Sequence, residues 1–252
     1  MSQYPILEFD EDRVALIDPE ALPKDEKLPQ RGVACFFQDV IERICVTGAA
    51  KEICRLKAEH ETQPIYELNY NRERLAVFNP GVGGPLAAAR LEAVAAMGLQ
   101  KVVACGGAGA LIADLSVGHI VVPSAAIRDE GTSYHYLPPG REIDVDLAVM
   151  KCIEDVLCER RVPYVLGKTW TTDAIFRETR NRAARRKSEG CVTVEMEAAS
   201  LLAVARFRGV ALGYLLYAGD SLAGDAWDHR GWPHHPGREE LFWLAAAAAA
   251  RL

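Results

Sequence analysis

Two glutamates flank a methionine where a predicted strand, residues 192–196, turns into a predicted helix, residues 197–208. A carboxylate near a helix N-terminus is favoured by the helix dipole, and this structural role alone could account for Glu197. Its chemistry also suits a binding role, because a carboxylate can accept both hydrogen bonds of a ribose diol. The Met196 side chain would then pack on the face of the sugar. The segment is therefore a candidate ribose site.

Two glycine-rich segments follow predicted strands and could bring backbone N–H groups close to a ligand. Residues 79–85 read NPGVGGP after a strand at 75–78, and residues 105–110 read CGGAGA after a strand at 101–105. Glycine lets the backbone approach an anion or a sugar, and a following helix adds unpaired N–H groups. The first segment lacks the spacing of a dinucleotide-binding motif, and the chain has no P-loop pattern. Ordinary tight turns are the alternative.

Asp220 follows Gly219 at the end of a long apolar strand predicted over residues 210–217. A partly desolvated carboxyl group at a strand end can donate a proton to a leaving group. An ordinary turn residue is the alternative. Because α/β folds bind ligands at the carboxyl ends of their strands, we expect Asp220, Glu197 and the glycine-rich segments to serve one site.

The composition is that of an ordinary soluble globular protein. Half of the 252 residues are hydrophobic, and the formal charge is −6, which argues against a nucleic-acid partner. The seven cysteines include no C-x-x-C pair, which favours reduced, buried thiols. No secretion signal is visible, and the longest apolar run, residues 241–250, is too short to cross a membrane. We therefore expect a cytoplasmic protein without a membrane partner.

The chain is expected to consist of an arm and one domain. Residues 1–30 are rich in proline and charge, which predicts an extended arm without a core of its own. Residues 31–252 alternate strands with helices, which predicts a single α/β domain with helices on both faces of a central sheet. The other predicted strands are 32–37, 119–122 and 163–168, and the other predicted helices are 39–45, 85–97, 144–160 and 239–251.

Taken in order, these segments resemble the uridine phosphorylase and hexameric purine nucleoside phosphorylase family. The resemblance spans roughly residues 75–222 and is carried by residues 78–111, VGHIVVP at 117–123, GKTWTTDAIF at 167–176 and VEMEAA at 194–199. It implies a three-layer phosphorylase/hydrolase-like fold with a central mixed sheet. It also implies phosphorolysis of the N-glycosidic bond of a purine or pyrimidine ribonucleoside, with inorganic phosphate as co-substrate and no other cofactor. Relatives assemble as dimers, often as trimers of dimers, so a homo-oligomer is expected.

The resemblance assigns roles around the sugar. Glu197 resembles the glutamate that holds the ribose 2′- and 3′-hydroxyls, and Met196 and Val82 resemble residues that line the sugar. Asp220 resembles the acid that protonates a purine ring as the bond breaks. His135 lies in a loop expected to cover the 5′ end of the sugar, so it is a candidate contact of the 5′-hydroxyl.

The residues of the predicted base site match the family pattern less completely than those around the sugar. Phe176 resembles the aromatic residue that packs near the base, and Thr172 and Arg180 complete the predicted base site. Uracil-specific relatives carry a Gln-x-Arg pair after this aromatic residue, whereas this chain has Glu178 and keeps Arg180. Asp220 favours a purine, so the identity of the base stays open at this point.

The phosphate site departs from the family pattern. The loop after the first strand normally reads G-D-P-x-R, but residues 35–41 read CFFQDVI, and a second arginine position is also not arginine. We therefore expect phosphate to meet the backbone of Gly83 and Gly107 and the side chain of Arg128. Arg90 or an arginine of a neighbouring subunit are other possible cations.

These departures leave two alternatives open. Water could replace phosphate in a nucleoside hydrolase, as in the related methylthioadenosine nucleosidases, with Asp10, Glu11 or Asp39 as the base for the water. A non-catalytic nucleoside-binding protein on the same fold is the second alternative. The acidic and histidine residues after Asp220 are too few for a convincing ligand set, so no metal site is expected.

Overall fold

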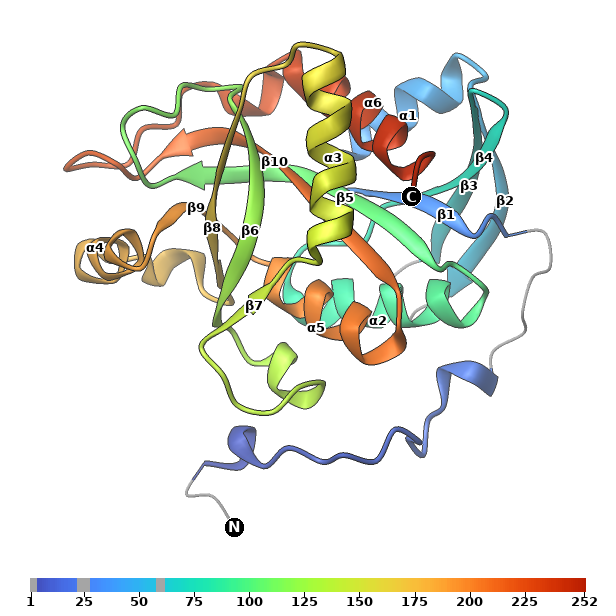
Figure 1. Ribbon diagram of the computed structural model, residues 1–252, viewed down its shortest axis with the longest axis horizontal. Coiled ribbons are helices and arrows are strands. Elements are labelled where there is room, and N and C mark those ends of the chain that lie inside the picture. Colours follow the sequence, from blue (N-terminus) through green and yellow to red (C-terminus); the bar gives the residue numbers. More distant parts are fainter. Residues whose placement is uncertain (1–3, 22–27, 58–61) are drawn as a thin grey trace.

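A mixed sheet forms the centre of the molecule in the computed structural model, which describes residues 4–21, 28–57 and 62–252 (Figure 1). Within these residues the sheet has ten strands, of which β5, β9, β8, β6 and β10 pair in sequence and β10 pairs back with β5. These five strands therefore close into a small barrel, from which β1, β4, β3 and β2 continue as an open wing. The strands are β1 Arg31–Cys35, β2 Ala50–Lys57, β3 Thr62–Tyr70, β4 Glu73–Phe78, β5 Lys101–Ala110, β6 Ile120–Asp129, β7 Glu142–Asp144, β8 Tyr164–Thr172, β9 Cys191–Glu195 and β10 Ala211–Ser221.

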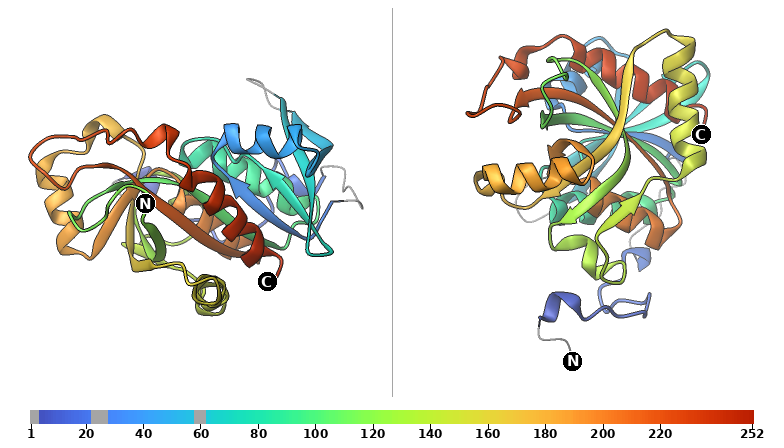
Figure 2. Two further views of the ribbon diagram at one scale, coloured as in Figure 1. Left: turned by 90° about the horizontal axis from the view of Figure 1, so that it is seen from above. Right: turned by 60° about the vertical axis from the view of Figure 1, so that its left-hand side comes forward.

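The helices cover both faces of the sheet (Figures 1 and 2). The buried faces of α2 and α5 share one hydrophobic core, and those of α1, α3 and α6 share another on the opposite face. The predicted three-layer α/β fold with a central mixed sheet is confirmed. The helices are α1 Gln38–Val46, α2 Gly84–Ala96, α3 Leu147–Glu159, α4 Arg180–Ser188, α5 Ala198–Arg208 and α6 Gly237–Ala249.

Four parallel strands bring the two glycine-rich segments and Asp220 to one edge. β1 pairs in parallel with β4 and with β5, and β5 pairs in parallel with β10. Their carboxyl ends therefore point the same way, and the segments that follow them meet there. The start of α2 also fits the prediction, because Pro85 occupies its first turn, where no backbone N–H is needed.

The second glycine-rich segment was expected to be a loop, and this expectation is wrong. Residues 106–110 continue β5, with Gly106 opposite Leu216 and Gly107 opposite Tyr217. A Cβ atom on Gly106 would lie 3.0 Å from the Phe36 ring, and one on Gly107 would lie 3.1 Å from the Tyr217 ring. The glycines are needed because aromatic rings lie directly against the strand.

Other boundaries also differ from the expectation. Pro123 was expected to end a strand, but β6 continues past it, and the pairing with β8 is irregular between Pro123 and Ala126, where a missing N–H is tolerated. The β2–β3 hairpin and helix α4 were not predicted. Helix α4 consists almost entirely of charged residues, so it lacks the apolar periodicity on which the prediction relied.

The described part of the arm, residues 4–21, lies along the outside of the domain near α2 and α5 (Figure 1). Its side chains are mostly exposed, and one of its contacts places the Arg13 guanidinium 5.1 Å from the centre of the Phe207 ring. Asp10 and Glu11, considered above as bases for a water molecule, are exposed on this arm. Among the described residues, no helix is long and apolar enough to cross a membrane.

Candidate active site

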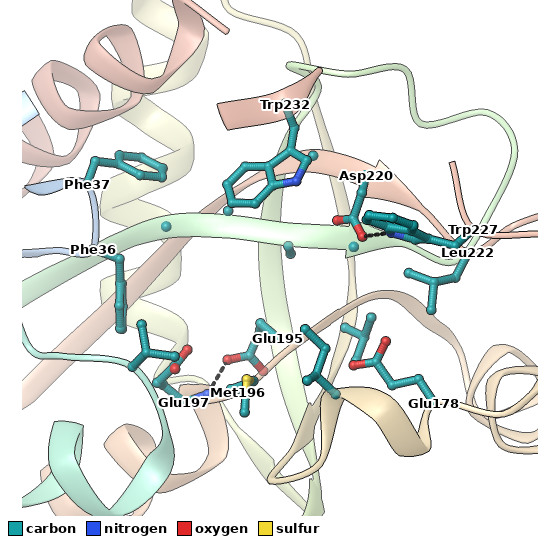
Figure 3. A pocket seen from close by; sticks show the side chains of 18 of the residues that line it. Phe36, Phe37, Glu178, Glu195, Met196, Glu197, Asp220, Leu222, Trp227 and Trp232 are labelled. Atoms are coloured by element: carbon teal, nitrogen blue, oxygen red, sulfur yellow. Dashed lines mark hydrogen bonds between the residues drawn. The ribbon is translucent and has the colours of Figure 1, made fainter. Parts of the chain in front are cut away.

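A cavity of about 600 Å³ lies at the edge where the predicted motifs meet (Figure 3). Segments following β1, β4 and β9 line it together with residues of β5 and β10. Its lining residues are Phe36, Phe37, Val82, residues 106–109, Ile175, Phe176, Glu178, residues 194–197, Tyr214, Gly219, Asp220, Leu222, Trp227, Trp232 and Arg238. Six of the predicted site residues are among them: Val82, Gly107, Phe176, Met196, Glu197 and Asp220.

The Glu197 carboxylate is fixed at the side of the cavity by the first glycine-rich segment. The backbone N–H of Gly83 donates a hydrogen bond of 2.5 Å to its Oε1 atom. Gly83 adopts a φ of 93°, which is strained for any other residue, so the sequence requirement for glycine has a direct cause. This N–H was predicted to bind phosphate, but in the structure it donates to Glu197 instead.

Glu195 lies beneath Glu197 and is held as an acceptor. It accepts hydrogen bonds from the Thr171 hydroxyl at 2.6 Å and from the backbone N–H groups of Glu197 and Ala198 at 2.7 and 2.6 Å. These donors favour the ionised form of Glu195. Burial, and then the charge of Glu195, raise the pKa of Glu197 to about 8. Burial raises the pKa of Glu195 as well, to about 7, so the two carboxyl groups form an acidic pair whose ionisation a ligand with hydrogen-bond donors or positive charge would favour.

The far end of the cavity holds two further carboxyl groups. Asp220 and Glu178 lie on opposite walls in Figure 3, and the Trp227 indole N–H donates a hydrogen bond of 2.6 Å to Oδ2 of Asp220. Burial, and then the charge of Asp220, raise the pKa of Glu178 to about 7. Repulsion by a nearby carboxylate disfavours the charged form of a carboxyl group, so this end of the cavity holds Glu178 partly in its protonated form near neutral pH. Glu178 was noted in the sequence but was not predicted as a site residue.

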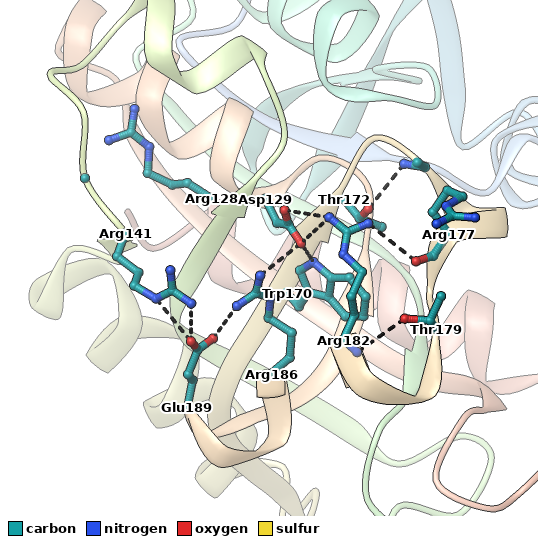
Figure 4. A network of polar contacts seen from close by, with 12 residues as sticks. Arg128, Asp129, Arg141, Trp170, Thr172, Arg177, Thr179, Arg182, Arg186 and Glu189 are labelled. Carbon is teal, nitrogen blue, oxygen red and sulfur yellow. Dashed lines mark hydrogen bonds and ion pairs between the residues drawn. The ribbon is translucent and has the colours of Figure 1, made fainter. Parts of the chain in front are cut away.

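A network of arginines and Asp129 holds the segment that carries Glu178 (Figure 4). Glu178 connects the short turn Ile175–Arg177 to α4. Arg182 and Arg186 of α4 pair with Asp129 of β6 at 2.9 and 3.1 Å, and the Trp170 indole N–H donates to the same carboxylate at 3.0 Å. Because Arg186 is almost fully buried, the network ties α4 firmly to the barrel.

Replacing Asp129 with asparagine should therefore destabilise the fold. The change leaves two arginines without their counter-charge, and we expect a loss of about 2–4 kcal/mol in the free energy of unfolding, measured by urea denaturation. Asp155→Asn, which breaks an exposed pair with Lys151, is the matched control, with an expected effect within about 0.5 kcal/mol. Equal effects of the two variants would show that the network is not a structural anchor.

Two other predicted base residues do not line the cavity. The Thr172 hydroxyl accepts a hydrogen bond of 3.2 Å from the backbone N–H of Ala174, and the Arg180 guanidinium donates to the backbone carbonyl of Asp225. Their assignment to the base site is not supported by this geometry, because local backbone groups use both side chains. Phe176 lies at the mouth, where its side chain is 97% exposed.

Arg128 and His135 both lie outside the cavity of their own chain. Arg128 is buried outside the cavity, where it donates to the Ser133 hydroxyl at 2.9 Å and to the Pro138 carbonyl at 2.7 Å. It holds its own loop together and is not available to phosphate. His135 lines a separate hollow, next to Arg13 of the arm. His135 therefore does not reach a sugar bound in the cavity of its own chain.

At the end occupied by Phe36 and Phe37, the cavity contains aromatic rings and one cation. The Phe36 ring covers Gly106, and the Arg238 guanidinium lies 4.5 Å from the centre of the Phe37 ring. Arg238 also pairs with Asp39 at 2.7 Å. Among the described residues, Arg238 is the only arginine or lysine that lines the cavity. No sequence motif indicated Arg238, because it comes from the start of α6, distant from the recognised motifs.

Comparison with known proteins agrees with this geometry. Residues 30–251 match the family model described as the phosphorylase superfamily. A guanosine phosphorylase of Halorubrum lacusprofundi is 30% identical over 183 residues, covering 69% of this chain and 74% of the relative. A uridine phosphorylase of Thermococcus kodakarensis is 25% identical over 217 residues, covering 76% of this chain and 77% of the relative.

Solved structures show the same fold. A purine nucleoside phosphorylase from Toxoplasma gondii superposes with a TM-score of 0.78 at 20% identity, covering 90% of this chain and 92% of that protein. The family match spans the whole α/β domain, including every strand that contributes to the cavity. The chain therefore belongs to the phosphorylase superfamily, as a member of the nucleoside phosphorylase family that its motifs resemble.

Proposed function

We propose that this protein is a nucleoside phosphorylase that cleaves the N-glycosidic bond of a ribonucleoside with inorganic phosphate. The observation that carries the proposal is the Glu197 carboxylate, which is only 6% exposed yet lines the cavity, held by the N–H of Gly83. A buried carboxylate without a protein cation is costly unless a ligand donates hydrogen bonds to it. The two hydroxyls of a ribose supply such donors.

The reaction follows from the distribution of charge along the cavity. As the C1′–N bond breaks, its electron pair leaves with the base and positive charge develops on the ribose. Glu197, with Glu195 behind it, stabilises that charge. Asp220 donates a proton to the departing base, and a phosphate oxygen forms the new bond to C1′, which gives ribose 1-phosphate and the free base.

Arg238 is the candidate for holding phosphate in place of the predicted groups. It lies at the end of the cavity away from Asp220 and Glu178, and its guanidinium is already fixed by Asp39 and by the Phe37 ring. An arginine oriented in this way can bind an anion with two hydrogen bonds. The names of the two relatives above, both phosphorylases, support phosphate as the acceptor.

Hydrolysis is the second candidate. It is favoured by one observation: the Phe36 ring covers Gly106, next to Gly107, whose backbone was expected to bind phosphate. Asp39 lies next to Arg238 and would serve as the base for a water molecule. In that reaction the products are ribose and the free base.

Product analysis with and without phosphate distinguishes phosphorolysis from hydrolysis. We expect base release to require phosphate and to give ribose 1-phosphate. Arg238→Gln should raise the KM for phosphate roughly 10–100-fold while changing the nucleoside KM little, because a charged hydrogen bond is lost. Arg251→Gln, at an exposed pair with Glu159, is the control. Free ribose formed without phosphate, and abolished by Asp39→Asn, would establish the hydrolase instead.

We also propose that the protein forms a homo-oligomer, as the family resemblance implies. Apolar side chains at the cavity mouth are strongly exposed in the single chain, including Val82 at 69% and Phe176 at 97%. A neighbouring subunit would cover these side chains and complete the 5′ end of the sugar site, which the His135 of the same chain does not reach.

A further inference from the structure

The base end of the cavity offers hydrogen-bond acceptors and almost no donors. The Glu178 carboxylate accepts no hydrogen bond from any residue that the structure describes, although it is half-buried. The Trp227 indole N–H is used by Asp220, and Arg180 does not line the cavity. A base bound here must therefore supply its own donors.

Nucleobases differ in the donors that their edges present. Uracil has one ring N–H between two carbonyl oxygens, which would face the Glu178 carboxylate with two repulsive contacts. Adenine presents a single amino group next to acceptor nitrogens. A 2-amino-6-oxopurine such as guanine presents a ring N–H directly beside an amino group, and the two can donate in parallel to the two oxygens of one carboxylate.

We propose that Glu178 is a specificity-determining residue that accepts the adjacent N1–H and N2–H groups of a 2-amino-6-oxopurine, while Asp220 faces the opposite, N7 edge. This inference rests on the proposed function and names the substrate class of the same cavity. The two carboxyl groups lie on opposite walls of one end of the cavity, as this arrangement requires (Figure 3).

The surroundings of Glu178 support this role. The charges that act on it come from Asp220 on β10, which opposes its ionisation, and from Arg182 on α4, which favours it. Arg182 is held by Asp129, so the position of Glu178 is set by the network described above. The resulting pKa of about 7 leaves a carboxylate that a donor-rich base readily stabilises in its ionised form.

The test compares guanosine, inosine, adenosine and uridine with the wild-type protein and Glu178→Gln. Inosine lacks only the 2-amino group, so the wild type should cleave guanosine with a kcat/KM roughly 10-fold or more above that for inosine. Glu178→Gln should lower kcat/KM for guanosine roughly 10–100-fold, because the glutamine amide places an N–H against an N–H donor of the base. The kcat/KM for adenosine should be nearly unchanged. Asp173→Asn is the matched control. The exposed Asp173 carboxylate lies on the same segment but accepts a hydrogen bond from the backbone N–H of Gly131.

Calorimetric binding of the same nucleosides keeps the inference testable if no base is released. Weaker guanosine binding by Glu178→Gln, without cleavage by either protein, would support the role of Glu178 and contradict the proposed reaction. If the wild-type protein binds and cleaves uridine or adenosine as efficiently as guanosine, the inference is overturned while the proposed reaction is supported. A guanosine preference that survives in Glu178→Gln would also overturn it.

Discussion

Replacing Glu197 with glutamine is expected to lower kcat/KM for the preferred nucleoside by roughly 100–1,000-fold while making the protein more stable. Activity falls because a neutral amide cannot offset the positive charge that develops on the ribose. Stability rises because a buried carboxylate next to Glu195 is removed. The pKa of Glu197 is raised from 4.5 to about 8 in the fold, so its ionisation opposes folding increasingly as pH rises between these values.

The pH dependence makes this prediction specific. Above pH 8 the variant should gain about 1–3 kcal/mol in the free energy of unfolding relative to wild type, whereas below pH 4.5 the two should be equal. Wild-type kcat/KM should rise with pH as Glu197 becomes ionised, and this rise should be lost in the variant. Glu73→Gln, at an exposed pair with Arg31, is the control for both readouts. A variant that is less stable than wild type at pH 8 would show that Glu197 is a structural acceptor only.

Replacing Asp220 with asparagine is expected to lower base release from a neutral purine nucleoside by roughly 100–10,000-fold. Asparagine has nearly the same size and can still accept the hydrogen bond from the Trp227 indole N–H. It cannot transfer a proton to the base, so the leaving group departs as an anion.

A substrate that needs no proton separates this role from a structural one. The base of 7-methylguanosine already carries a positive charge, so we expect Asp220→Asn to slow its cleavage less than roughly 10-fold. Asp225→Asn, on the exposed loop that follows β10, should leave the cleavage of both substrates unaffected. Equal losses with guanosine and 7-methylguanosine would mean that Asp220 positions the base but does not act as the acid.

The layers of the fold could be predicted because apolar periodicity marks each major element. The helices at α2, α3, α5 and α6 and most strands of the barrel were located to within a few residues. The β2–β3 hairpin escaped because its residues alternate weakly between apolar and charged types, and half of it faces solvent. Residues 106–110 were assigned to a loop because glycine usually marks turns, whereas here it makes room for Phe36 and Tyr217.

The site could be predicted where a side chain is fixed by the backbone element that carries it. Glu197 and Asp220 lie at strand ends, Met196 precedes Glu197, and Val82 lies in the segment after β4. All four line the cavity as predicted from these positions. Arg128 could not be placed, since its direction depends on two carbonyl groups of its own loop, nine and ten residues later in the chain.

Residues that reach the cavity from distant parts of the chain were also missed. Arg238 comes from the start of α6, and no local pattern indicates that it reaches the cavity. Glu178 was noted in the sequence as a departure from the family pattern, but its place in the cavity depends on the segment before α4, which Asp129 anchors.

A crystal structure of Asp220→Asn with guanosine and phosphate would test the central claim most directly. The account predicts that the ribose 2′- and 3′-hydroxyls lie within hydrogen-bond distance of the Glu197 carboxylate, with the base between Asn at position 220 and Glu178 and the phosphate beside Arg238. A nucleoside bound with its ribose turned away from Glu197, or bound outside this cavity, would contradict it.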